Sequence, residues 1–216
     1  MKTLKGIDSV IFDLDGTLWD ASEASAVAWN RAIKDLGLEM GEVEPIDIAS
    51  ISGKTPREFV SKIFKNAPPD KSMEWYSLCA QYEMEEIRGG RGLLREGIRD
   101  AFEVLSKELP IFLVSNCQRD YMNAFLNWSG LEHMITDSLT HGENGRSKWE
   151  NLLLLVEKHG LVKPVYVGDT LEDRESALKA GIDFIPIHPA FKDNHRQMGY
   201  GFTLDAVLNT IIGGIG

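Results

Sequence analysis

Short apolar runs and longer helical patterns alternate along most of the chain. The runs lie at residues 10–12, 111–115, 165–167 and 184–187, each bounded by Gly, Pro or Asp, and a loop and usually a helical pattern follow. This alternation predicts an α/β fold in which helices cover both faces of a parallel sheet. Functional groups are then expected in the loops beyond the carboxyl ends of the strands, where Asp13, Ser115 and Asp169 fall.

The alternation stops between about residues 20 and 88. Helical patterns follow one another there, over residues 22–36, 56–65 and 72–87, which indicates an inserted all-helical unit. Its borders are the turn after Leu18 and the glycine-rich RGGRG of residues 88–92, a composition that suits a hinge. We therefore expect a core of residues 1–19 and 90–216 and an inserted four-helix domain of residues 20–89.

Composition limits the class of protein. With 216 residues, 43% of them hydrophobic, the chain can bury the core of one ordinary domain plus an insertion. Its net charge of -10 argues against nonspecific nucleic-acid binding, which depends on Lys and Arg neutralising phosphates. The first apolar run is broken by Asp8 and ends at Asp13, so it predicts neither a signal peptide nor a membrane-spanning helix. We expect a cytoplasmic protein with no membrane partner.

The first candidate for chemistry is DLDGT, residues 13–17. Asp13 and Asp15 stand two residues apart at a strand end, and Gly16 lets the chain turn sharply so that both carboxyls approach one point. A strand that simply enters an Asp-Gly turn would explain Asp15 and Gly16. It would leave Asp13 as an unpaired carboxylate on a buried run, which is costly, so we favour a functional pair.

Two further positions carry polar groups that could bind an anion, one at the end of a later strand and one at the start of a later helix. Ser115 and Asn116 end an apolar run before a helical pattern over residues 120–129, and an ordinary helix cap is the competing interpretation. Ser147 and Glu150 predict a capping box that places Lys148 in the first turn of a helix. A cation there opposes the helix dipole, at about 0.3 to 1 kcal/mol, and a bound anion would remove the conflict.

A solvated surface lysine is the simpler interpretation of Lys148, and Arg146 competes for the same role. The fourth candidate is GDTLED, in which Asp169 follows a strand and Asp173 lies one helical turn later. Helix capping explains one of these two acids, but two strand ends that each carry paired acids are less easily explained by capping.

Taken together and in this order, DLDGT, Ser115-Asn116, Lys148 and GDTLED resemble the four motifs of the haloacid dehalogenase-like hydrolase superfamily. The resemblance covers nearly the whole chain. The helical insertion directly after the first motif is similar to the C1 cap of the phosphoglycolate phosphatase and β-phosphoglucomutase branch. This resemblance implies a Rossmann-like three-layer α/β/α core, an inserted four-helix cap and Mg²⁺-dependent phosphoryl transfer.

The same resemblance implies a role for each matched residue. Asp13 is expected to be the nucleophile that forms an aspartyl-phosphate, and Asp15 the acid and base that serves the leaving oxygen and then water. Phosphate-binding groups are expected at Ser115, Asn116 and Lys148. Metal ligands are expected at Asp13, Asp15, Asp169 and Asp173, the second through its backbone carbonyl and the last mostly through water.

Physical chemistry supports a metal there independently. Two like charges about 4 Å apart cost on the order of 4 kcal/mol at an effective dielectric near 20, so several carboxylates need a cation. An all-oxygen site that shares a phosphate suits Mg²⁺ better than zinc. The five histidines show no ligand pairing, and we expect His188 and His195 to be solvated. The two cysteines, Cys79 and Cys117, lie far apart in the sequence and suggest neither a disulfide framework nor a zinc site.

The departures from the family pattern narrow the function. Dehalogenases of the family lack the second aspartate of the first motif, so Asp15 favours a phosphate ester over a carbon–halogen bond. Ser25 stands where the sugar-phosphate mutases carry a histidine, which disfavours a mutase. We expect a phosphatase acting on a small phosphorylated metabolite, as a monomer or homodimer. A phosphotransferase, a receiver domain and a silent phosphate-binding protein are the alternatives.

Specificity is expected to come from the insertion, because the four motifs contact only the phosphoryl group and the metal. Residues 51–59, ISGKTPREF, resemble the substrate-specificity loop of the cap. Lys54 and Arg57 are the candidates to meet the leaving group, with Trp19 packing against it. The competing interpretation is that both cations are solvated and that Trp19 packs within the linker.

Overall fold

The computed structural model describes residues 5–51, 54–65, 67–68, 70–188 and 202–215. Its main sheet has five strands in the order β5-β4-β1-β6-β7, and every neighbouring pair is parallel. The strands are β1 (Ser9–Phe12), β4 (Ile111–Ser115), β5 (Asp137–Thr140), β6 (Pro164–Gly168) and β7 (Asp183–Pro186). The predicted parallel α/β sheet is thus confirmed.

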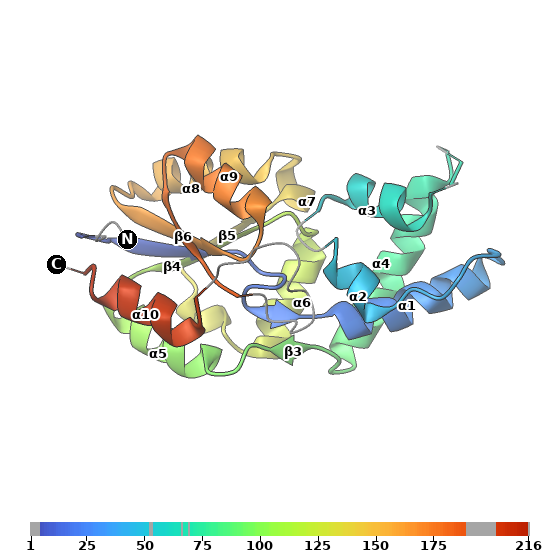
Figure 1. Ribbon diagram of the computed structural model, residues 1–216, viewed down its shortest axis with the longest axis horizontal. Coiled ribbons are helices and arrows are strands. Elements are labelled where there is room, and N and C mark those ends of the chain that lie inside the picture. Colours follow the sequence, from blue (N-terminus) through green and yellow to red (C-terminus); the bar gives the residue numbers. More distant parts are fainter. Residues whose placement is uncertain (1–4, 52–53, 66, 69, 189–201, 216) are drawn as a thin grey trace.

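Helices cover both faces of this sheet (Figure 1). The apolar side chains of β1 point alternately to the two faces, so each face needs a layer of helices to bury them. Val10 and Phe12 join one buried cluster, and Ile11 joins the other. The first face carries α5 (Ile98–Glu108), α6 (Arg119–Ser129) and α10 (Leu204–Ile212), and the second carries α8 (Lys148–His159) and α9 (Leu171–Ala180). The core therefore has the three expected layers.

Several boundaries differ from the sequence-based expectation by one or two residues. The strand β7 begins one residue earlier than expected, and α6 begins at Arg119 rather than at residue 120. The edge strand β5 was not expected at all, since its sequence DSLT has one large apolar residue and is polar at its start. Two short elements, η1 (Glu132–Met134) and α7 (His141–Asn144), flank that strand.

The inserted segment leaves and rejoins the core through a pair of short antiparallel strands. These are β2 (Trp19–Asp20) and β3 (Leu93–Leu94). Between them lie α1 (Ser22–Asp35), α2 (Pro45–Ala49), α3 (Pro56–Ile63) and α4 (Ser72–Arg88), which we call the helical insertion. It has a hydrophobic cluster of its own around Trp29 and extends beyond the ends of the sheet strands (Figure 1).

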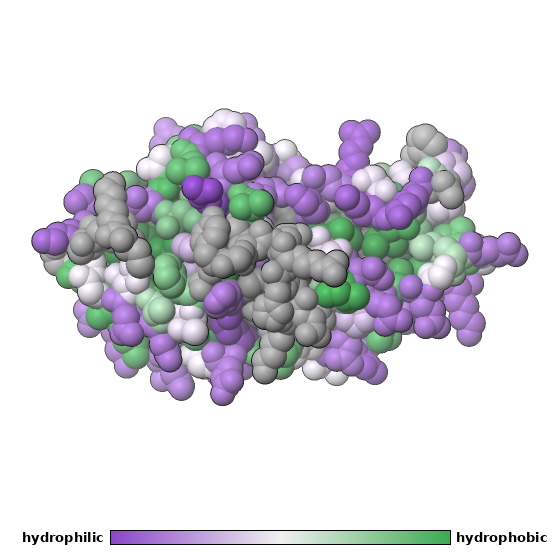
Figure 2. Space-filling view, in the orientation of Figure 1, coloured by the Kyte–Doolittle hydropathy of each residue, from purple (hydrophilic) through white to green (hydrophobic). Residues whose placement is uncertain are grey.

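The outer surface of both parts is largely hydrophilic on the face that Figure 2 shows, with hydrophobic side chains visible between the charged ones. None of the helices in the described ranges is both long and apolar enough to cross a membrane.

Candidate active site

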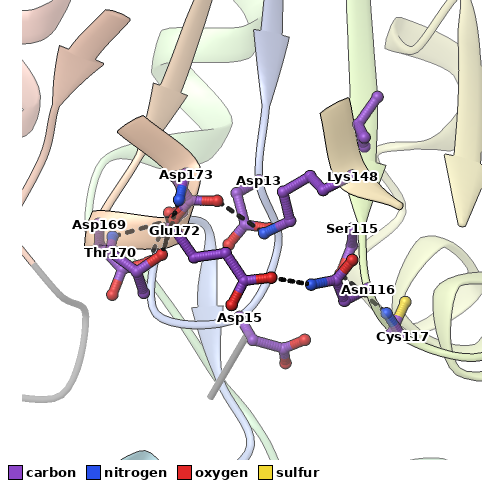
Figure 3. Close-up of polar contacts among 12 residues, drawn as sticks. Asp13, Asp15, Ser115, Asn116, Cys117, Lys148, Asp169, Thr170, Glu172 and Asp173 are labelled. Atoms are coloured by element: carbon purple, nitrogen blue, oxygen red, sulfur yellow. Dashed lines mark hydrogen bonds and ion pairs between the residues drawn. The ribbon is translucent and has the colours of Figure 1, made fainter. Parts of the chain in front are cut away.

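Three neighbouring strands of the sheet deliver the candidate residues to one edge. Asp13 follows β1, Ser115 ends β4 and Asp169 follows β6, and β1 lies between the other two strands. Because the strands are parallel, their carboxyl ends meet, and Figure 3 shows these side chains around one point. Asp13, Ser115 and Asp169 are all buried.

The loop after β1 turns so tightly that only glycine fits at its centre. Gly16 has a φ of +82°, and a Cβ atom there would lie 2.5 Å from Oδ2 of Asp169. Arg95 fixes the same turn, because its guanidinium donates to the carbonyl oxygens of Gly16 at 2.9 Å and Thr17 at 2.5 Å. The hydroxyl of Thr17 in turn donates to Oδ1 of Asp169 at 2.9 Å. This hydrogen bond fixes the loop after β1 against the loop after β6.

Lys148 lies at the centre of the acidic cluster. Its Nζ donates to Oδ1 of Asp13 at 2.8 Å and to Oδ1 of Asp173 at 2.6 Å, and its side chain is only 1% exposed. The expected capping box of Ser147 and Glu150 is present and starts α8 at this lysine. Arg146, the competing candidate, is exposed.

Asp173 is held by more donors than any other acid described in the site. The Thr170 backbone N–H and hydroxyl donate to its Oδ2 at 2.9 and 2.5 Å, and the Tyr166 hydroxyl donates to its Oδ1 at 3.0 Å. Burial by itself would raise the pKa of Asp173, but the Lys148 charge and the hydrogen bonds from Lys148 and Thr170 hold it below its ordinary value. Asp173 is therefore an ionised, fixed partner for Lys148.

The other acids are less well compensated. Burial, followed by the charge of Asp173, raises the pKa of Asp13 well above its ordinary value and that of Asp169 to about 7. Burial also raises the pKa of Asp15 to about 6, although the Tyr121 hydroxyl and the Trp19 indole N–H donate to its Oδ1 at 2.6 and 3.2 Å. Each of these carboxyls would gain from a nearby positive charge.

A divalent cation fits this arrangement. One carboxylate oxygen each from Asp13, Asp169 and Asp173 lies within 4.8 Å of the others. An octahedral Mg²⁺ binds oxygens at about 2.0–2.1 Å, so its ligand atoms lie roughly 3 to 4 Å apart. In addition, Oδ2 of Asp13 is buried and has no hydrogen-bond partner within the described ranges. Buried oxygens are rarely left without a partner, so a ligand for that atom is expected.

The residues expected to hold phosphate lie beside these acids. The Ser115 hydroxyl accepts a hydrogen bond from the Cys117 backbone N–H at 3.2 Å, and the Asn116 amide donates to Oε1 of Glu172 at 2.8 Å. Both Ser115 and Asn116 are buried and line a cavity that also borders Asp15. The polar contacts of Asn116 and Cys117 are visible in Figure 3.

That cavity, of about 290 Å³, lies between the strand ends and the helical insertion. Lys54 lines it, and its Nζ lies 3.0 Å from Oε2 of Glu172, so the insertion contacts the core at this point. Arg57 is exposed and is not part of the lining, while Ser52 and Gly53 of the same loop lie outside the described residues.

Trp19 does not face the cavity either. It is fully buried, with its ring centroid 5.0 to 5.5 Å from those of Tyr121, Phe125 and Trp128. This placement favours the linker-packing interpretation, with the addition that the indole N–H positions Asp15. His188 is exposed, and His195 lies outside the described residues.

Four residues at the site were not found from the sequence. Tyr121 contacts Asp15, Arg95 holds the first loop, Glu172 joins Asn116 to Lys54, and Glu83 lines the cavity from α4. Only Glu172 carried a signal, since it lies inside GDTLED, next to Asp173. The others are single residues in ordinary helical or loop sequence, and only the folded chain brings them together.

Residues 10–187 match the family described as haloacid dehalogenase-like hydrolase, which is most of the chain. The chain belongs to this family. The phosphoglycolate phosphatase of Aquifex aeolicus (strain VF5) is 31% identical over 179 residues, covering 80% of both sequences. This relative and the family match confirm the resemblance to the phosphoglycolate phosphatase branch and identify the chain as a phosphatase-type hydrolase.

Solved structures of other proteins share the fold. A haloacid dehalogenase-like family protein from Streptococcus pneumoniae superimposes with a TM-score of 0.71 at 21% identity, covering 95% of this chain and 90% of the other. A predicted phosphatase from Clostridium acetobutylicum gives 0.77 at 15% identity, covering 96% and 99%. At these identities the likeness supports the three-layer fold with its helical insertion and nothing finer.

Proposed function

We propose that this hydrolase is a Mg²⁺-dependent phosphatase that acts on a small phosphorylated metabolite through an aspartyl-phosphate at Asp13. The observation that carries the proposal is the cluster at the strand ends. A buried cation, Lys148, lies within hydrogen-bonding distance of Asp13, while the second oxygen of Asp13 has no partner within the described ranges. Asp15, two residues later, borders the cavity in which a leaving group fits.

Asp13 is suited to nucleophilic attack on phosphorus because its position is fixed. Its backbone N–H donates to the Val167 carbonyl at 2.9 Å, and Lys148 holds Oδ1 at 2.8 Å. The expected attack forms a P–O bond from the carboxylate and breaks the ester P–O bond, and water then cleaves the acyl phosphate. Ser115, Asn116 and Lys148 are proposed to bind the oxygens of the transferring phosphoryl group.

Asp15 is suited to proton transfer because its pKa of about 6 is close to neutral pH. Tyr121 and Trp19 fix its Oδ1, which leaves Oδ2 to serve the reacting oxygens. In the first step it would give a proton to the leaving alkoxide. In the second it would take a proton from the attacking water, so the residue returns to its starting state.

Asp13, Asp169 and the backbone carbonyl of Asp15 are proposed to hold Mg²⁺, with Asp173 supporting the site. When bound, the ion would neutralise these carboxylates and the negative charge of the phosphoryl group. We further propose that the helical insertion, residues 20–89, acts as the cap domain that closes the cavity and selects the substrate.

A phosphate-release assay on a panel of phosphorylated metabolites tests this proposal. The wild-type protein should release phosphate in the presence of millimolar-range Mg²⁺, and this release should stop when a chelator is added. Asp13→Asn should lose turnover while circular dichroism shows an intact fold, because the neutral amide cannot attack phosphorus. Near-wild-type activity of Asp13→Asn, or full activity in chelator, would refute the mechanism. Phosphate transfer to added alcohols in place of release would identify a phosphotransferase.

A further inference from the structure

The part of the cavity nearest the helical insertion differs in chemistry from the part at the strand ends. Four aromatic side chains line the cavity, Trp29, Phe59 and Tyr76 from the insertion and Tyr121 from α6 of the core. Asp15 and Gly16 border the same space, so a group attached to a phosphoryl at Asp13 would extend toward these rings. Apolar walls bind the body of a leaving group but do not distinguish its polar end, so specificity requires a polar group in this wall.

Glu83 of α4 is such a group. Its Oε1 lies within hydrogen-bonding distance of the Ser25 hydroxyl from α1, which also lies 3.0 Å from the Ala21 carbonyl oxygen. No donor to the other carboxylate oxygen of Glu83 is found within the described ranges, although this side chain lines the cavity. Burial raises the pKa of Glu83 to about 7; the hydrogen bond with Ser25 opposes this rise, and the charge of Asp15 adds a smaller rise. A poorly solvated carboxylate with an unused oxygen favours a ligand that donates a hydrogen bond.

The charges around the cavity also favour a leaving group that donates a hydrogen bond. Within the described ranges its lining has a single Lys or Arg, Lys54, which already pairs with Glu172 at 3.0 Å. Carboxyl groups are more numerous in the lining, at Asp15, Asp20, Glu83 and Asp120. Since Asp15 holds the proton for the leaving group when the ester binds, the negative charge that a substrate meets comes from the other three. A leaving group with its own carboxylate would therefore meet like charges, whereas a hydroxyl or ammonium group would meet acceptors.

We propose that Glu83, positioned by Ser25, is a specificity-determining residue that accepts a hydrogen bond from a hydroxyl or ammonium group of the leaving group. The preferred substrates are then phosphate monoesters of small hydroxylated or aminated alcohols rather than esters that carry a carboxylate. This substrate class rests on the phosphatase function proposed above.

Three esters with two-carbon leaving groups test the proposal, because they differ only at the far end: 2-hydroxyethyl, 2-aminoethyl and carboxymethyl phosphate. In wild type, kcat/KM for the better of the first two should exceed that for carboxymethyl phosphate by about tenfold or more. The order of the first two then distinguishes a hydroxyl from an ammonium ligand. Carboxymethyl phosphate is phosphoglycolate, the compound in the name of the Aquifex aeolicus relative.

Glu83→Gln should reduce that preference by about tenfold, since an amide keeps the shape but also donates to a carboxylate. Glu85→Gln is the matched control, because Glu85 lies on the same helix, outside the cavity lining, and pairs with Arg31. It should keep the wild-type preference. A preference for carboxymethyl phosphate in wild type, or equal preferences in the two variants, would overturn the proposal.

Binding separates this inference from the proposed function. In Asp13→Asn protein with Mg²⁺, calorimetry should rank the binding affinities of the three esters in the same order as kcat/KM does in wild type. Adding Glu83→Gln should reduce the differences between these affinities. If wild type hydrolyses none of the esters but Asp13→Asn ranks them as expected, the phosphatase proposal fails and the role of Glu83 stands. If the esters are hydrolysed and bound with the opposite ranking, the role of Glu83 fails and the phosphatase stands.

Discussion

Replacing Lys148 with methionine should destabilise the protein strongly, and the structure gives the size of the effect. The lysine is buried and is the shared partner of Asp13 at 2.8 Å and Asp173 at 2.6 Å. Removing one partner of a buried ion pair costs about 3–5 kcal/mol, because a buried charge is left uncompensated. We therefore expect Lys148→Met to lower the free energy of unfolding by about 3–5 kcal/mol at pH 8 without Mg²⁺.

The matched control is Lys158→Met in the same helix. Lys158 pairs with Asp137 at 2.8 Å, but its side chain is 55% exposed, so the expected loss is about 0–1 kcal/mol. Urea unfolding followed by circular dichroism measures both variants. A loss for Lys148→Met that is no larger than the loss for Lys158→Met would refute the idea that this lysine compensates the acids.

Two conditions should modify the loss if the reasoning is right. Without the lysine, the pKa of Asp13 in the folded protein should rise further. A carboxyl whose pKa is raised in the folded state makes the protein less stable as pH rises toward and through that raised pKa. The destabilisation by Lys148→Met should therefore be smaller at pH 5.5 than at pH 8. Added Mg²⁺ should reduce the difference in the free energy of unfolding between Lys148→Met and wild type, because the ion replaces the missing positive charge. A difference that is the same under all conditions would contradict the proposed metal site without reference to catalysis.

Three further predictions concern activity. Asp169→Ala should raise the Mg²⁺ concentration for half-maximal phosphate release or abolish release, and an unchanged Mg²⁺ titration would contradict its role as a ligand. Tyr121→Phe removes a 2.6 Å hydrogen bond that lowers the pKa of Asp15, so the alkaline limb of the kcat/KM profile should move to higher pH; a profile that does not move would remove Tyr121 from the account. Lys54→Ala should raise KM for small phosphorylated metabolites, whereas Arg57→Ala should not, since of the two only Lys54 lines the cavity. An unchanged KM in both variants would indicate that both are solvated surface cations, and a raised KM for Arg57→Ala would contradict its placement.

The sequence was most informative where local patterns decide structure. The apolar runs of β1, β4 and β6 are buried on both faces, which makes them nearly continuous in sequence and easy to detect. The edge strand β5 lacks this signal, because its first two residues are only partly buried and its pattern is that of a loop. The capping box at Ser147 was likewise readable, because it depends on residues three positions apart.

Long-range contacts explain what the sequence did not predict. Tyr121 is 106 residues from Asp15, and Glu172 is 56 from Asn116, so no local pattern connects them. The three candidates for leaving-group contact separate for the same reason. Trp19 is drawn into an aromatic cluster of the core, Arg57 is exposed on α3, and Lys54 alone lines the cavity. Side-chain direction in an insertion depends on helix packing, which composition and motif spacing do not specify.

Trapping the covalent intermediate tests the central claim most directly. A substrate identified in the phosphate-release screen would be mixed with wild-type protein and Mg²⁺, quenched in acid within one turnover and treated with borohydride, which reduces an acyl phosphate to an alcohol. Peptide mass spectrometry should then find homoserine in place of aspartate at position 13, and Asp13→Asn protein should show no such change. Burst phosphate release with an unmodified Asp13, or reduction at another carboxylate, would contradict the proposed aspartyl-phosphate.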